Sequence, residues 1–189
     1  MAESIWKSTL QEFRDQLASR DPVPAGVSVA AVSASLGLSL FSKVLEISRA
    51  RKDFQGDGAQ IEAAFASARA ESKKLEHYAD ADIVAFAEYM TSRRTPNESA
   101  ALRRAIEIPL AAARAAASGL KLCADAVGTT PASIAPDLGT AALLLGSSIR
   151  GMLLSVESNA LRLSDPEFQD QVAREVEILT QLAKKHQQW

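Results

Sequence analysis

The stretch SVAAVSASLGLSLFSKVLEISRAR, residues 28–51, decides the fold class. It is rich in alanine, serine and glycine, whose small side chains let a neighbouring helix approach closely. It overlaps the longest uncharged run, residues 22–42, which has about the length of a membrane span but opens with a Pro-Gly loop and contains five serines. We therefore expect a buried helix at the centre of the fold.

The composition around this helix favours an all-α protein. The chain has 189 residues, of which 47% are hydrophobic but only 5% aromatic, so the apolar weight lies in alanine, leucine, valine and isoleucine. Such residues pack as closely spaced helices. A chain of this length can bury a core without disulfides or metal. We expect one helical domain over residues 1–189.

Hydrophobic periodicity and capping signals predict about six helices. Asp57 is a fair N-cap for a long helix, and Thr95, Pro96 and Glu98 combine a capping threonine, a proline at the first helical position and a capping-box glutamate. Pro109 predicts a kink near Ile106. The expected helices cover residues 4–19, 28–51, 57–93, 95–127, 136–163 and, after the cap signal at 164–167, up to about residue 187.

Charge and cysteine content exclude some partners and compartments. The net charge is −2, with 21 basic and 23 acidic residues and no basic block longer than two, so we expect no nucleic-acid partner. A single cysteine, Cys123, excludes a disulfide framework within the chain and favours a reducing compartment. The charged N-terminal stretch lacks the apolar core of an export signal. We expect a cytoplasmic protein that does not bind a membrane.

Several motifs follow one another in a recognisable order. The first is PVPAGVSVAA at residues 22–31, and the second is the acidic segment YADADIVAF at 78–86. IPL at 108–110 comes next, then IAPDLGTAALLL at 134–145 and RGMLLSVESN at 150–159. Together they resemble the cyclodeaminase/cyclohydrolase family, which comprises formimidoyltetrahydrofolate cyclodeaminases and methenyltetrahydrofolate cyclohydrolases.

This resemblance implies a function in folate-dependent one-carbon metabolism. The implied substrates are 5,10-methenyltetrahydrofolate, which a cyclohydrolase opens with water, and 5-formimidoyltetrahydrofolate, which a cyclodeaminase cyclises with release of ammonia. Both reactions need proton transfer, which a carboxylate can carry out without a metal. The expected assembly is a homodimer with a cleft between subunits. We prefer the cyclohydrolase reaction, because no transferase domain accompanies the chain.

Three positions depart from the family pattern and support a second interpretation. Ala25 and Val27 replace the first and third glycines of the family's loop, and Ser155 replaces the first asparagine of its later pair. A valine side chain narrows the approach of a ligand to backbone amides. The alternative is therefore a non-catalytic helical binding or assembly protein that kept the family fold.

Two aspartates are the catalytic candidates. Asp137 matches the family's aspartate before its A-A-L run, although an aspartate near a helix start is also a common cap. Asp80 and Asp82 are two residues apart, so they point about 200° away from each other on a helix and cannot form a carboxylate pair. Asp82 is nearer the apolar face, and we interpret Asp80 as a solvated charge.

The remaining candidates would bind the folate. The resemblance assigns Gly26 and Ser28 to the loop that approaches the ligand. Arg51 and Lys52 could hold its glutamate tail, although cations are also favoured at a helix C-terminus without any ligand. Asn159 lies 22 residues after Asp137, about 33 Å along one helix. It therefore serves either another part of a two-subunit site or a hydrogen bond inside the bundle.

Small side chains on two of the predicted helices suggest how two chains would associate. We expect a dimer formed by close helix packing through Ala30, Ala34, Gly37, Gly139, Gly146 and Gly151. Neither histidine has a second ligand-type residue at metal-binding spacing, so we expect no metal site.

Overall fold

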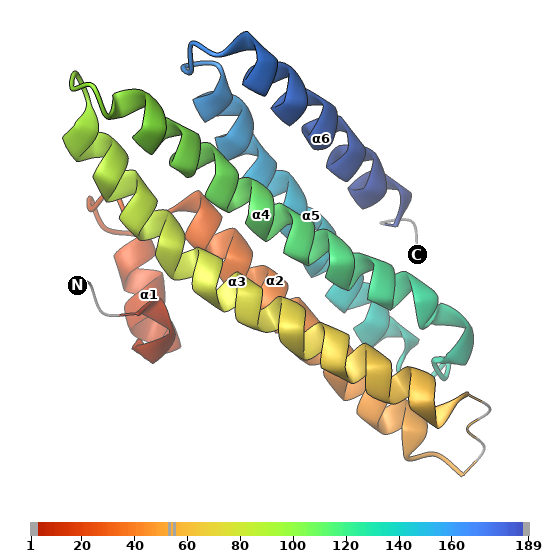
Figure 1. The fold of residues 1–189 in the computed structure, drawn as a ribbon. Helices are drawn as coiled ribbons and strands as arrows, with labels where there is room; N and C mark the ends of the chain where they lie inside the picture. Colours follow the sequence, from red (N-terminus) through yellow and green to blue (C-terminus); the bar gives the residue numbers. More distant parts are fainter. Residues whose placement is uncertain (1–3, 53, 55, 187–189) are drawn as a thin grey trace.

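The computed structural model describes residues 4–186 except 53 and 55, and this part of the chain is helical without strands. Long antiparallel helices form a bundle, with a short helix against one side and the last helix against the other (Figure 1). This arrangement confirms the predicted all-α fold. The α-helices are α1 (Leu10–Leu17), α2 (Gly26–Arg49), α3 (Gly58–Ser92), α4 (Glu98–Asp125), α5 (Ala135–Ala160) and α6 (Pro166–Lys185).

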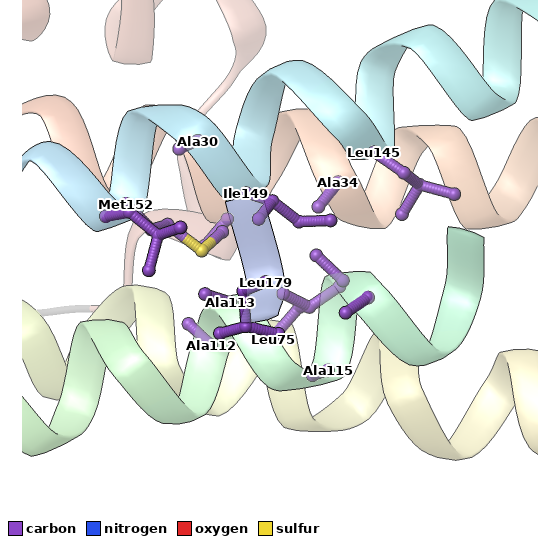
Figure 2. Close-up of a cluster of buried hydrophobic side chains, with 14 of the residues drawn as sticks. Ala30, Ala34, Leu75, Ala112, Ala113, Ala115, Leu145, Ile149, Met152 and Leu179 are labelled. Atoms are coloured by element: carbon purple, nitrogen blue, oxygen red, sulfur yellow. The ribbon is translucent and has the colours of Figure 1, made fainter. Parts of the chain in front are cut away.

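Small residues bring α2 and α5 into close antiparallel contact. A Cβ atom on Gly37 would lie 3.1 Å from the carbonyl oxygen of Ala141, and one on Gly151 would lie 3.6 Å from the Cβ of Ala30. Ala34 is fully buried at the same interface (Figure 2). Four of the small residues that we expected between two chains, Ala30, Ala34, Gly37 and Gly151, therefore pack two helices of one chain. The dimer itself stays a prediction.

The core runs the length of the bundle between α2, α3, α4 and α5. Leu75 of α3, Ala113 of α4 and Ile149 and Met152 of α5 meet there, each with no exposed surface (Figure 2). Many of the buried side chains of α4 are alanines, and their small size lets the neighbouring helices pack closely. Large aromatic side chains are not needed to fill this part of the core. By length and composition α2 and α5 would both qualify as membrane spans, but about half of each apolar window is buried inside the bundle.

Polar contacts fasten α6 to α4 and α5. The guanidinium of Arg103 pairs with Asp165 and lies over the ring of Phe168, and Arg114 pairs with Glu175. Gln169 donates its side-chain amide to the carbonyl oxygens of Ala160 and Leu163, both at 2.8 Å. The turn between α5 and α6 is therefore held by side chains rather than by backbone bonds alone.

The N-terminal segment differs from the single helix that we predicted over residues 4–19. A 3₁₀ turn, Ile5–Lys7, precedes α1, and the two are separated by a capping box. The Thr9 amide donates to the Glu12 carboxylate at 2.7 Å, and the Glu12 amide donates to the Thr9 hydroxyl at 3.1 Å. This box starts a new helix at Leu10, which is why the predicted continuous helix was wrong.

Two of the other predicted helix starts are confirmed, and one is wrong. Asp57 caps α3 by accepting from the Ala59 amide at 2.8 Å, and Asp165 caps α6 by accepting from the Phe168 amide at 3.1 Å. Thr95 does not cap α4, which begins at Glu98. Arg94 adopts a left-handed conformation, φ 62°, and its amide takes the Glu98 carboxylate that a capping box would have used.

Pro109 lies inside α4, as the sequence predicted. The kink near Ile106 stays a prediction. The predicted end of the last helix near residue 187 falls outside the described residues, and α6 is described up to Lys185.

Candidate functional site

A cleft of about 320 Å³ lies where α2 begins. The loop before α2, the last third of α3, the first half of α4 and the end of α5 meet there, so segments far apart in the sequence form its walls. Its lining consists of Pro22, Val23, Ala25, Gly26, Val27, Asp82, Phe86, Ala105, Leu154, Ser155, Ser158 and Asn159. Three of the motifs identified in the sequence therefore meet in one place.

Within the described part of the chain, Asp82 is the one titratable side chain that lines this cleft. It is half-buried on α3, and burial raises its pKa from 3.8 to about 6. Among the described residues no side chain or amide is found hydrogen-bonded or ion-paired to it. A carboxylate with a pKa near neutrality can take up and release a proton under working conditions.

Asp80, two residues earlier, has a structural contact instead. Its carboxylate accepts a hydrogen bond from the Ile5 amide at 3.0 Å, and the Trp6 indole donates to the Glu76 carbonyl oxygen at 3.0 Å. These bonds fasten the N-terminal segment to α3. The expectation that Asp80 is merely a solvated charge was incomplete, because the sequence does not show which segment packs against α3.

The N-terminus of α2 opens onto the cleft. Its N-cap residue, Ala25, makes no side-chain capping bond. The first amides of a helix have no acceptor within the helix, so this end carries a partial positive charge. A Cβ atom on Gly26 would meet nothing within 4 Å, so the chain's own packing does not require glycine there. Val27 is only 4% exposed and fills part of the cleft wall.

Ser28 follows Gly26 on the same turn but faces into the bundle. It is fully buried, and its hydroxyl donates to the carbonyl oxygen of Ala79 at 3.3 Å. This bond ties α2 to α3 beneath the cleft. The side chain of Ser28 therefore holds α2 against α3 and does not line the cleft, whereas Gly26 does.

Asn159 of α5 makes a contact across the cleft to α4. Its side-chain amide donates to the carbonyl oxygen of Ala105 at 3.1 Å, and both residues line the cleft. The hydrogen bond inside the bundle, one of the two roles that the sequence allowed, is therefore present, and Asn159 also lines the cleft. Its part in a two-subunit site stays a prediction. Ser155 lies three residues before Ser158 and four before Asn159, so the three side chains share one face of α5.

The structure places Asp137, Arg51 and Lys52 elsewhere. Because α2 and α5 are antiparallel, the first turn of α5 lies at the opposite end of the bundle from the cleft. Asp137 is roughly 27 Å along α5 from Ser155 at 1.5 Å per residue. Arg51 and Lys52 follow the C-terminal end of α2 and are exposed. One chain does not bring these three residues to Asp82.

A second cavity, of about 400 Å³, lies near that opposite end. It is lined mainly by apolar side chains, with Asp57 and Asp125 among its few charged residues. Neither cavity holds a metal-ligand set, because no group of three or more histidine, cysteine, aspartate or glutamate residues gathers in the described part of the chain. We favour the smaller cleft as the site because it contains Asp82 and the end of a helix.

Ala105 and Ser158 line the cleft but were not among the predicted site residues. Ala105 gives no signal in the sequence, because only its backbone carbonyl takes part. Ser158 was detectable, since the spacing of Ser155, Ser158 and Asn159 places all three on one side of a helix.

Comparisons with known proteins show the family of the chain. The sequence profile of the formiminotransferase-cyclodeaminase family matches residues 9–178. The chain belongs to this family. It is 28% identical to formimidoyltransferase-cyclodeaminase of the pig, Sus scrofa, over 96% of this chain, and it spans only 36% of the length of that relative.

Two further relatives match nearly end to end. Methenyltetrahydrofolate cyclohydrolase of Methylorubrum extorquens is 27% identical, with 90% of this chain and 88% of that protein covered. The solved structure of formiminotetrahydrofolate cyclodeaminase from Thermotoga maritima matches with a TM-score of 0.92 at 22% identity, covering 97% of this chain and 94% of that chain. The family fold therefore extends over almost all of the chain.

Proposed function

We propose that this member of the formiminotransferase-cyclodeaminase family is an enzyme that opens 5,10-methenyltetrahydrofolate with water. The observation that carries the proposal is the position of Asp82, an unpaired carboxylate in a cleft built from the family's own motifs. The near end-to-end match to a methenyltetrahydrofolate cyclohydrolase supports this reaction, and the equally complete match to a formiminotetrahydrofolate cyclodeaminase makes cyclisation of 5-formimidoyltetrahydrofolate the second candidate.

The chemistry follows from the charge of the substrate. The bridging carbon of 5,10-methenyltetrahydrofolate belongs to a cationic amidinium, so an ionised Asp82 attracts it electrostatically. Water adds to that carbon while Asp82 accepts one of its protons, which gives a tetrahedral adduct. One carbon–nitrogen bond of the adduct then breaks. The departing nitrogen takes back the proton from Asp82, and the hydroxyl group of the adduct loses its proton to water, which leaves the formyl product and one released proton. Asp82 must be ionised at the start, which a pKa of about 6 allows at neutral pH.

The altered loop is compatible with this proposal. Ala25 and Val27 replace two glycines, but Gly26 keeps open space around it and the first amides of α2 remain uncapped. These amides can donate hydrogen bonds to an oxygen of the ligand. The alternative of a non-catalytic assembly protein has no structural observation in its favour.

We also propose that the protein is a homodimer and is located in the cytoplasm. The neighbouring helices α2 and α5 expose large apolar side chains in the single chain, namely Val29, Leu36, Leu143 and Leu154. An apolar surface of this kind is typical of a subunit interface. Such an interface is also the only way in which Asp137, Arg51 and Lys52 could approach the cleft, from a second subunit.

The test is direct. Opening of 5,10-methenyltetrahydrofolate is followed by the loss of its near-ultraviolet absorbance, and ammonia release from 5-formimidoyltetrahydrofolate is measured in parallel. We expect turnover in the first assay that is lost in Asp82→Asn. Isothermal titration with tetrahydrofolate derivatives separates the alternative, because an inert protein would give no heat of binding even at millimolar ligand.

A further inference from the structure

Because of Pro109, the backbone carbonyl oxygen of Ala105, which lines the cleft, lacks its usual donor within the helix. In an α-helix the carbonyl oxygen of Ala105 would accept from the amide of residue 109, four positions later. Proline has no amide hydrogen, so that bond cannot form. Ala105 is only 7% exposed, and the side-chain nitrogen of Asn159 supplies the missing donor at 3.1 Å.

This bond fixes which way the Asn159 amide points. A carbonyl oxygen can only accept, so the nitrogen end of the amide must face Ala105 and the oxygen end must face away. The Asn159 Oδ1 atom has no partner among the described residues. No buried side-chain oxygen in that part of the chain is left unsatisfied, so Oδ1 is accessible to solvent. Asn159 lines the cleft that contains Asp82.

We propose that Pro109 is a positioning residue, which acts through Ala105 to hold the Asn159 amide with its oxygen toward the bound substrate. Asn159 Oδ1 then accepts a hydrogen bond from a neutral donor, either an N–H group of the reduced pterin or the attacking water. This inference rests on the proposed function. With a normal helical residue at position 109, the amide would be free to turn its nitrogen toward the ligand.

Pro109→Ala is the decisive variant, because it restores the backbone amide without touching the cleft. The new amide of residue 109 donates to the Ala105 carbonyl oxygen in place of Asn159, whose side chain is then free to turn. We expect kcat/KM for 5,10-methenyltetrahydrofolate to fall by roughly 3–10-fold, the range expected for one neutral hydrogen bond, while the helix is at least as well formed. A purely structural proline predicts unchanged kinetics, and wild-type kcat/KM in this variant would overturn the proposal.

A stability cycle tests the pairing itself. Asn159→Ala leaves the Ala105 carbonyl unsatisfied and should lower Tm by roughly 3–9 °C. Adding Pro109→Ala to it should restore much of the Tm but none of the lost turnover. Gln169→Ala is the matched control, since its side-chain amide also satisfies backbone carbonyls but lies at the α5–α6 turn. It should lower Tm without changing kcat/KM.

The kinetic constants identify the donor. A higher KM together with weaker tetrahydrofolate binding assigns the hydrogen bond to the pterin, and a lower kcat with unchanged KM assigns it to the water. A wild-type chain without turnover would refute the proposed function, whereas the stability cycle would still decide whether Pro109 and Asn159 are coupled. An absent Tm rescue in the double variant would refute that coupling.

Discussion

Replacing Asp82 by asparagine should abolish turnover and stabilise the fold at the same time. The two effects have one cause. Burial in the cleft raises the pKa of Asp82 from 3.8 to about 6, and no cation compensates for the ionised form. Asparagine keeps the size of the side chain and removes the charge. The variant therefore loses the proton acceptor and also the cost of burying it.

The size and pH dependence of the stability gain follow from the pKa. The folded state binds the Asp82 proton more tightly than the unfolded state, so ionisation opposes folding. This cost is fully present above about pH 6, shrinks as the pH falls, and disappears below 3.8. A shift of this size corresponds to at most about 3 kcal/mol, and the partial exposure of Asp82 reduces it. We expect Asp82→Asn to raise Tm by roughly 3–9 °C at pH 8 and very little at pH 4.

Both effects can be measured on the same samples. Turnover of 5,10-methenyltetrahydrofolate should fall by ~10²–10⁴-fold, and the wild-type rate should rise with pH through an inflection near 6 that the variant lacks. Asp80→Asn is the matched control, because Asp80 holds the Ile5 amide and does not line the cleft. It should keep its activity. Turnover of Asp82→Asn within tenfold of wild type, or a lower Tm at pH 8, would refute the assignment.

Three further variants test the rest of the proposal. Asp137→Asn should keep turnover close to wild type, because Asp137 lies at the far end of the bundle; a loss above tenfold would show that a second subunit brings it to the cleft. Val27→Gly should bind tetrahydrofolate more tightly in titration calorimetry, despite a lower Tm from the cavity it creates, and weaker binding by a folded variant would indicate another ligand. Leu36→Glu combined with Leu154→Glu should convert a dimer into a monomer in light scattering, and a wild-type monomer would remove the two-subunit cleft.

Helix starts were predictable from sequence where a cap acts within a few residues. Asp57 and Asp165 each accept a hydrogen bond from a backbone amide two or three residues later in the sequence. Both the residue that signals the helix start and its bonding partner are therefore close together in the sequence. Thr95 failed because the backbone conformation of Arg94 redirected the Glu98 carboxylate. The capping box of Thr9 and Glu12 is also local, whereas helical periodicity alone extends the predicted helix back to residue 4. A local cap therefore decides the start of α1 more strongly than periodicity does.

The site was predictable only in part, because the register between helices is not local. The resemblance indicated Gly26, Asp82 and Asn159 separately, and helix packing brings them into one cleft. The same packing sends Asp137 and Arg51 to the other end. The sequence also could not show that Ser28 turns inward, since the burial of a serine depends on which helix lies opposite.

The position of Asp82 bears on whether this protein is a catalyst or an inert relative. A bundle that only needed to keep its shape would be more stable with an apolar or amide side chain there, because a carboxylate without a partner costs free energy at neutral pH. Three other half-buried acidic side chains discussed above, Asp80, Asp165 and Glu175, have partners that offset this cost. Asp137 is also half-buried without a partner in the described part of the chain, but it lies at the far end of the bundle, whereas Asp82 lines the cleft and has its pKa raised by burial to about 6. Under the proposed function, a ligand supplies the positive charge that Asp82 lacks, as the amidinium of the proposed substrate does.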